Sequence, residues 1–200
     1  MTNKSAMQRA LSIIKDEHCS LAAVLHGMLY LVREIRERGA KPDLAVLRAM
    51  VYYIDSFSER FHHPKEDEYL YAALRQRTAK ATTLLEEVEQ DHAEGGKLIR
   101  DLEQSLLRYD AGGAQQFDAF AKSVEEYAEF HWRHMRLEED RLMPLAQQHL
   151  TERDWERIAN AFSENGDPLF GVECDQEFRA LFTRIVTLAP APLGVGAPLT

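Results

Sequence analysis

Apolar residues recur at helical spacing along most of the first 150 residues, and this period constrains the fold more than any other feature. It predicts four long helices, over residues 5–38, 43–77, 79–109 and 115–148. Gly39 is a typical helix stop, and Pro42 restarts the chain. The stripe of the first helix consists of Leu11, Ile14, His18, Leu21, Leu25, Met28 and Val32.

Four such helices with short connections favour an all-α fold, an antiparallel up-down-up-down four-helix bundle. Each helix would be about 45–50 Å long at 1.5 Å per residue. With 45% hydrophobic residues, the 200-residue chain can bury a sizeable core. We expect the bundle over residues 1–150. For residues 151–200 we expect a C-terminal extension that packs on the bundle, with a short helix capped by Thr151, an amphipathic segment over 174–188 and an extended tail.

The charge of the chain excludes some classes of partner. A net charge of −9 leaves no basic stripe for nucleic acid. No segment approaches the roughly 20 apolar residues that span a bilayer, and the N-terminus lacks the apolar run of a signal peptide. The two cysteines, Cys19 and Cys174, give no disulfide framework. We therefore expect a cytoplasmic protein without a nucleic-acid or membrane partner.

Two segments repeat one arrangement, in which a histidine is followed four residues later by a glutamate. The pairs are His62 with Glu66 and His134 with Glu138. Residues four apart share one face of an α-helix, so each pair presents an imidazole and a carboxylate to one point. This combination suits iron, manganese or zinc, because a carboxylate can also bridge two ions. Two pairs on separate helices predict a metal centre.

The other two long helices each carry a histidine within their apolar stripe, His18 in the first and His92 in the third. Burying these groups without a metal would be costly. The four inward imidazoles divide into two metal positions with two histidines each, bridged by the two glutamates. The predicted ligands are His18, His62, Glu66, His92, His134 and Glu138.

Neighbouring residues leave alternatives open. His63 and Asp67 form a rival pair on the second helix, but His62 and Glu66 are preferred because the parallel with the fourth helix extends to an apolar residue eight positions after each histidine. His131 is either a group that orients a ligand or a polar rim residue. Of the acidic runs at 66–68 and 138–140, only the first member of each is expected to face inward. Tyr69 and Tyr127 are expected to be core aromatics, and Pro64 to kink the second helix.

In these segments the chain resembles hemerythrin-like proteins of the HHE cation-binding type. The matching pieces are KDEH at 15–18, FHHPKEDEYL at 61–70, QDHAEG at 90–95 and HWRHMRLEED at 131–140, and the resemblance covers roughly residues 7–149. It implies a non-haem di-iron centre, two oxo- or hydroxo-bridged irons held in an antiparallel four-helix bundle. It also implies the same six ligands.

The chain departs from the oxygen carriers that it resembles at one position. Those carriers have a second histidine four residues after the one on the third helix, where this chain has Gly96. Gly95 and Gly96 together are therefore expected to form an open wall beside His92. Such relatives imply binding or sensing of dioxygen, nitric oxide or peroxide, or iron handling under stress. The alternatives are an enzyme that reduces nitric oxide or peroxide, and a metal-dependent regulatory module with a protein partner or as a homodimer.

Overall fold

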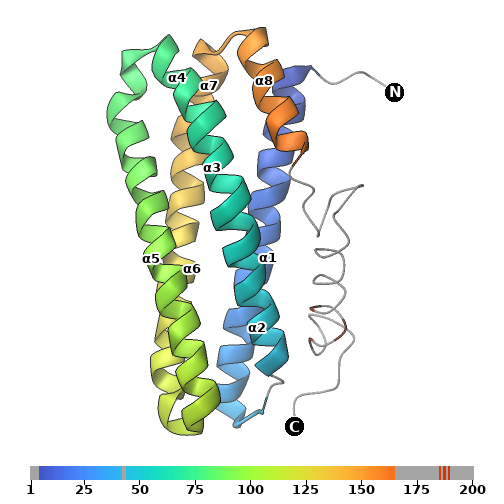
Figure 1. Ribbon diagram of the computed structural model, residues 1–200, viewed down its shortest axis with the longest axis vertical. Coiled ribbons are helices and arrows are strands. Elements are labelled where there is room, and N and C mark those ends of the chain that lie inside the picture. The colour runs from blue at the N-terminus through green and yellow to red at the C-terminus, as the bar shows by residue number, and fades with distance from the viewer. Residues whose placement is uncertain (1–4, 42–43, 165–184, 186, 188, 190–200) are drawn as a thin grey trace.

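The computed structural model describes residues 5–41, 44–164, 185, 187 and 189. All regular secondary structure in this part of the chain is helical, as the sequence predicts. Long helical rods lie side by side along the long axis of the molecule (Figure 1). None of the described helices combines the length and apolar character needed to cross a membrane.

The first rod is one uninterrupted helix, α1 (Ala6–Arg38). Its N-terminus is closed by a capping box, in which Ser5 Oγ accepts from the Gln8 backbone N–H and the Gln8 side chain accepts from the Ser5 backbone. It ends at Gly39, whose φ of 64° is a left-handed conformation that glycine adopts without strain. The predicted first helix is thus confirmed at both ends.

The second rod is composite, because two π-helical stretches interrupt it. Pro64 has no N–H to donate, and its ring would clash with a carbonyl one turn earlier, which favours opening the α-helical ladder here. The structure therefore has π-helical turns on both sides of Pro64, where the sequence predicted a kink. The segments are α2 (Leu44–Tyr53), η1 (Ile54–His62), α3 (His63–Lys65), η2 (Glu66–Tyr71) and α4 (Ala72–Arg77), with η1 and η2 π-helical.

The third and fourth rods follow after short connections, and the fourth again contains a π-helical turn. The chain then turns into α8 (Glu152–Ser163), which packs on α1 (Figure 1). Thr151 caps α8 as predicted. The amphipathic segment and tail expected after residue 174 lie almost wholly outside the described residues. The remaining elements are η3 (Ala79–Ala81), α5 (Thr82–Gly112), η4 (Gly113–Gln116), α6 (Phe117–Leu137), the π turn η5 (Glu138–Leu142) and α7 (Met143–His149).

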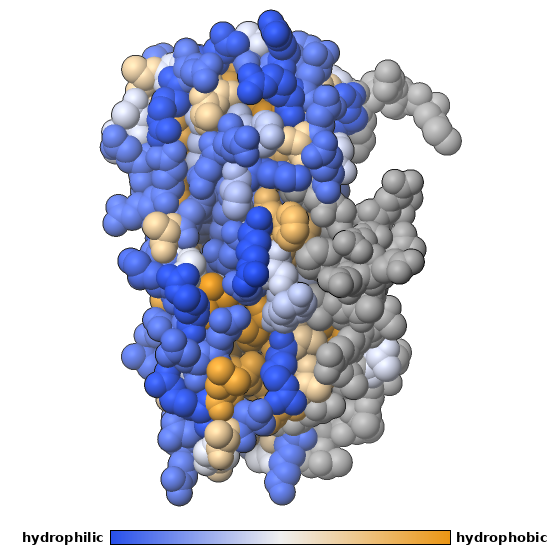
Figure 2. Space-filling view, viewed as in Figure 1, coloured by the Kyte–Doolittle hydropathy of each residue, from blue (hydrophilic) through white to orange (hydrophobic). Residues whose placement is uncertain are grey.

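The buried apolar side chains form two clusters. One contains Met28 and Phe120 and joins α1, α2, α5 and α6. The other contains Ile14 and Trp155 and includes residues of α1, α4, α5, α7 and α8. Hydrophilic side chains cover most of the face in Figure 2, with an apolar strip in its lower half where α2 and α5 run side by side. The buried polar residues of the predicted metal centre belong to neither apolar cluster.

Candidate metal centre

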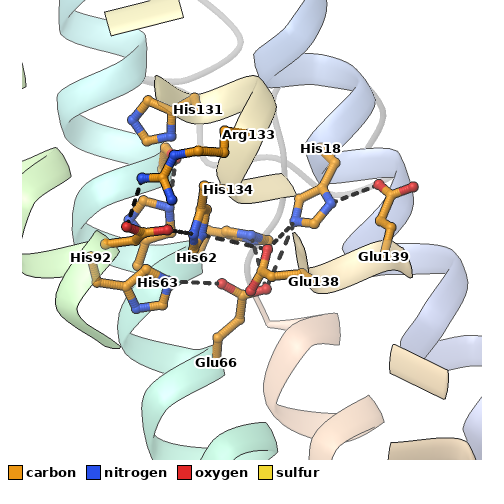
Figure 3. A network of polar contacts seen from close by, with 12 residues as sticks. His18, His62, His63, Glu66, His92, His131, Arg133, His134, Glu138 and Glu139 are labelled. Carbon is orange, nitrogen blue, oxygen red and sulfur yellow. Dashed lines mark hydrogen bonds and ion pairs between the residues drawn. The ribbon is translucent and has the colours of Figure 1, made fainter. Parts of the chain in front are cut away.

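The structure brings the six predicted ligand residues together from all four rods (Figure 3). Glu66 and Glu138 begin π segments of the second and fourth rods, and both are completely buried. His18, His62 and His134 are no more than 3% exposed, and the His92 side chain is 7% exposed. A buried polar constellation of this kind needs partners that compensate its lost hydration.

The Nε2 atoms of the four imidazoles face the two glutamates. Glu66 carboxylate oxygens lie 3.3 Å from His62 Nε2 and 3.4 Å from His92 Nε2. Glu138 Oε2 lies 3.3 Å from His18 Nε2 and 3.5 Å from His134 Nε2. Each glutamate therefore lies between imidazoles of two different rods, which is the arrangement that bridging carboxylates need.

The opposite ring nitrogen, Nδ1, of each of these imidazoles faces a second carboxylate. In metal sites this contact fixes the orientation of the ring and raises its basicity. The Nδ1 to oxygen distances are 2.9 Å for His18 and Glu139, 2.6 Å for His62 and Glu17, 2.9 Å for His92 and Asp67, and 3.5 Å for His134 and Asp91.

These four supporting carboxylates form a closed ring around the molecule. Each is the sequence neighbour of a predicted ligand on its own rod, and each supports the imidazole of another rod. The first rod supports the second, the second the third, the third the fourth, and the fourth the first. The expectation that only the first member of each acidic run faces inward is wrong for Asp67 and Glu139, which make these contacts.

Electrostatics in the centre follow from burial opposed by charge. Burial alone would lower the pKa of His62, but the charge of Glu66 and the hydrogen bond with Glu17 raise it to about 9. Burial likewise opposes protonation of His92, but the hydrogen bond with Asp67 and the nearby Glu66 carboxylate raise its pKa to about 10. Burial would raise the pKa of Glu66, yet the surrounding imidazoles hold it well below its usual value. Without a cation, the carboxylates thus rely on protonated imidazoles for compensation.

Several buried polar atoms of the centre have no hydrogen-bond partner. They include both carboxylate oxygens of Glu66, Oε2 of Glu138, and Nε2 of His18 and His134. Unsatisfied buried polar atoms are costly, and metal ions coordinated by these nitrogens and oxygens would satisfy them. The residues present therefore fit a metal centre.

The nitrogen and oxygen atoms divide into two groups that share Glu66. One group is His18, His62 and Glu66, and the other is His63, Glu66, His92 and His134, with the ligand atoms of each group within 4.8 Å of one another. The structure thus differs from the expected two imidazoles per position, because His63 joins the second group. Adjacent residues point in different directions around a helix, so His62 and His63 face different groups instead of competing for one.

A second buried cluster adjoins the centre. Glu59 lies 3.4 Å from His63 Nδ1 and 3.5 Å from His131 Nε2, and the Tyr127 hydroxyl donates to it at 2.8 Å. His131 is completely buried, so it is not a rim residue. Burial, together with the charge of His92, lowers the pKa of His63 to about 3.

Tyr71 was missed by sequence reasoning. Its hydroxyl donates to Glu138 and lies 3.4 Å from His92 Nε2, and the residue is completely buried. Sequence reasoning singled out Tyr69 and Tyr127 instead. Tyr69 is only partly buried among the apolar residues of one core cluster.

The wall expected to be open at Gly95 and Gly96 is closed at Gly95 and open at Gly96 apart from one side chain. A Cβ on Gly95 would lie 3.4–3.5 Å from atoms of Phe130, Glu59 and His131, so this glycine is packed. A Cβ on Gly96 would meet only Arg100, at 3.7 Å. The space at Gly95 is therefore filled by side chains of the second and fourth rods, and the space at Gly96 is not.

A surface pocket instead reaches the centre at His18, between α1 and α6. Its volume is about 310 Å³, near the lower end of small-ligand pockets at roughly 300–1,000 Å³. Its walls combine apolar, aromatic and charged side chains, and Cys19 and His26 are exposed. The lining residues are His18, Cys19, Ala22, His26, Trp132, Met135, Arg136 and Glu139.

Comparison with known proteins agrees with this geometry. No curated protein and no solved structure matches the chain. The family model described as the hemerythrin HHE cation-binding domain matches residues 9–146, a span that contains every residue of the two metal-binding groups and of the carboxylate ring. The chain belongs to the hemerythrin HHE cation-binding domain family.

Proposed function

We propose that this protein holds two iron ions in an antiparallel up-down-up-down four-helix bundle and uses them to bind or sense dioxygen, nitric oxide or peroxide. The ligands would be His18, His62, Glu66, His92, His134 and Glu138. Cation binding is the property of the family, and the binding of two ions is what we add to it.

The ring of supporting carboxylates carries this proposal. A histidine pair on a protein surface needs no partner at its second nitrogen, whereas metal-binding histidines nearly always have one. Here four imidazoles on four rods each have one, and their other nitrogens converge on two buried glutamates. The two groups of ligand atoms share Glu66, which favours a pair of ions over a single one.

Iron is favoured among the candidate metals by the family. The mixed imidazole and carboxylate donors suit iron, but manganese and zinc accept them as well. Bound iron would supply electron transfer and an electrophilic site for a small ligand. The chain itself would orient the imidazoles through the carboxylate ring, and the Tyr71 hydroxyl would hold one oxygen of Glu138. The pocket at His18 has room for a diatomic gas or peroxide.

The first test is metal content. Anaerobic reconstitution with ferrous iron should give close to two irons per chain, followed by charge-transfer absorption after oxidation. Glu66→Ala should reduce the content of both ions, because this carboxylate belongs to both groups. The control is Glu68→Ala, which removes an exposed carboxylate two residues away.

Retention of two irons by the Glu66 variant would reject the assignment of that ligand, and binding of one iron or none by the wild type would reject the paired centre. The same reconstituted protein separates binding from catalysis. Uptake of one nitric oxide or peroxide molecule without turnover supports a sensor or carrier. Repeated turnover with an electron donor would make the protein an enzyme, the second function that the open pocket favours.

A further inference from the structure

His63 is a buried imidazole that the family's six-residue pattern does not use. It is 4% exposed and stands immediately after His62. Its ligand atom lies within 4.8 Å of those of Glu66, His92 and His134, which belong to three different rods. The other group of the centre, by contrast, contains two imidazoles.

Glu59 supports His63 as the ring carboxylates support their imidazoles. Glu59 Oε2 lies 3.4 Å from His63 Nδ1, one helical turn earlier on the same rod. Glu59 is itself fixed by the Tyr127 hydroxyl, which donates to its other oxygen at 2.8 Å. His63 Nδ1 therefore faces a carboxylate, as the Nδ1 atoms of the other imidazoles do, and Nε2 lies 3.4 Å from the Ser58 hydroxyl.

We propose that His63 is a fifth imidazole ligand, which completes a three-histidine position with His92 and His134 and leaves a two-histidine position at His18 and His62. This inference rests on the proposed two-ion centre. It makes the two positions unequal. The position with fewer imidazoles is the one that keeps room for an external ligand, and it is also the one that the surface pocket reaches through His18.

The third rod has glycine four residues after His92, so it offers no second imidazole to this position. His63 would supply that imidazole from the second rod. In the structure the rings of His63 and His92 are stacked, with centroids 4.2 Å apart and planes at 14°. To bind one ion, the two rings would have to turn out of this parallel arrangement. The alternative role for His63 is therefore to support the His92 ring by stacking on it.

The experiment separates a nitrogen ligand from a stacked ring. His63→Phe keeps an aromatic ring against His92 but removes both nitrogens, whereas His63→Ala removes both functions. Competition with a chelator would measure the two stepwise affinities of the full chain for Fe²⁺ under anaerobic conditions. The control is His131→Phe, the same exchange at another buried histidine that faces Glu59 but lies in neither ligand group.

Loss of a supporting contact typically weakens metal binding roughly 10–100-fold, so loss of a ligand should reach or exceed the upper end of that range. We expect His63→Phe to weaken one ion by about 100-fold or more and to leave the other nearly unchanged. His62→Phe should weaken the opposite ion. His131→Phe should change neither affinity by as much as tenfold.

Wild-type affinities for both ions in His63→Phe, with a loss only in His63→Ala, would overturn the proposal and leave His63 as a stacked support. Should His63→Phe not fold, Glu59→Gln provides the second test, because it keeps the shape of the side chain and weakens its hold on His63. We then expect a loss of about 10–100-fold for one ion, and unchanged affinity would overturn the inference. Failure of the wild type to bind two ions would instead refute the proposed function.

Discussion

The Tyr71 hydroxyl shows why part of the site lies beyond a reading by helical periodicity. In an α-helix Leu70, four residues after Glu66, would share its face. Residues 66–71 are π-helical, and a π turn takes about one residue more, so Tyr71 returns to that face instead. The two histidine–glutamate pairs were predictable because a spacing of four keeps both side chains on one side of either helix type.

The supporting carboxylates were harder to predict, because each acts on another rod. Glu139 follows Glu138 in the sequence, and periodicity turns it away from the ligand face of its own helix. Its partner, His18, is 121 residues away. Only the packing of the rods reveals that a side chain outside the ligand face of its own helix can contact a ligand on the neighbouring helix. A carboxylate beside one ligand of each rod was nevertheless visible in the sequence, at positions 17, 67, 91 and 139.

We expect Glu139→Gln to weaken metal binding by about 10–100-fold, since the His18 imidazole would lose its charged partner. The measurement is the stepwise affinity for Fe²⁺ or Mn²⁺ by chelator competition. Asp140→Asn is the control, because it removes an exposed charge from the next position. An equal effect of the two substitutions would mean that general charge, and not orientation of His18, governs affinity.

Among the elements, the helices were predictable and their interiors were not. Ser5, Gly39 and Thr151 mark helix ends through caps that act within a few residues, so the sequence alone locates them. The π segments contain or adjoin the buried residues His62, Glu66 and Glu138, and two of them flank Pro64. A proline indicates that the α-helical hydrogen bonds are interrupted but does not by itself decide between a kink and a π turn, which is why a simple kink was expected at Pro64.

The junction of α4 with α8 gives a prediction at this scale. Arg77 Nε and an amino nitrogen of its guanidinium donate to Asp154 at 2.8 and 2.9 Å, and Asp154 also accepts from the Thr151 backbone. The Arg77 hydrogen bonds, followed by those of Thr151, hold the pKa of Asp154 well below its usual value. Asp154→Ala should lower the free energy of unfolding of the metal-free protein by about 1 kcal/mol at pH 7, the usual cost of a lost cap.

The pH dependence of this effect has a definite sign. A carboxyl with a lowered folded-state pKa adds stability that is fully present above its unfolded pKa, near 3.9, and is lost as the pH falls through the folded value. The difference between wild type and variant in urea unfolding should therefore be constant from pH 7 to 5 and shrink below about pH 4. A difference that grows on acidification would contradict the role given to the ionised carboxylate.

For the whole molecule, the important feature is that apolar packing is divided between two clusters. Neither cluster contains the centre's ligands, which come from all four rods. Without metal, the centre joins the rods only through polar contacts whose net contribution is modest. An ion held from several rods would connect them directly.

We therefore expect metal to stabilise both clusters together. An ion at 100 times its dissociation constant should add about 2.7 kcal/mol to the free energy of unfolding. The measurement is amide hydrogen exchange of the Mn²⁺-loaded protein compared with the chelator-treated protein. We expect slower exchange in α8, which belongs to one cluster, and also in α2, which belongs to the other. Protection confined to the turns that carry the ligands would show that the clusters open independently. Glu66→Ala should abolish the response.

The three π segments also set the rotational phase of the helices that follow them. Each absorbs a residue that a regular α-helix would have used to turn by about 100°. If the same residues of η5 ran as a regular α-helix, Met143 and Ala146 of α7 would turn by about 100° away from the core in which they are buried. The π turns therefore let the residues that face the metal centre differ in spacing from those that face the core beyond it, without turning the following helix.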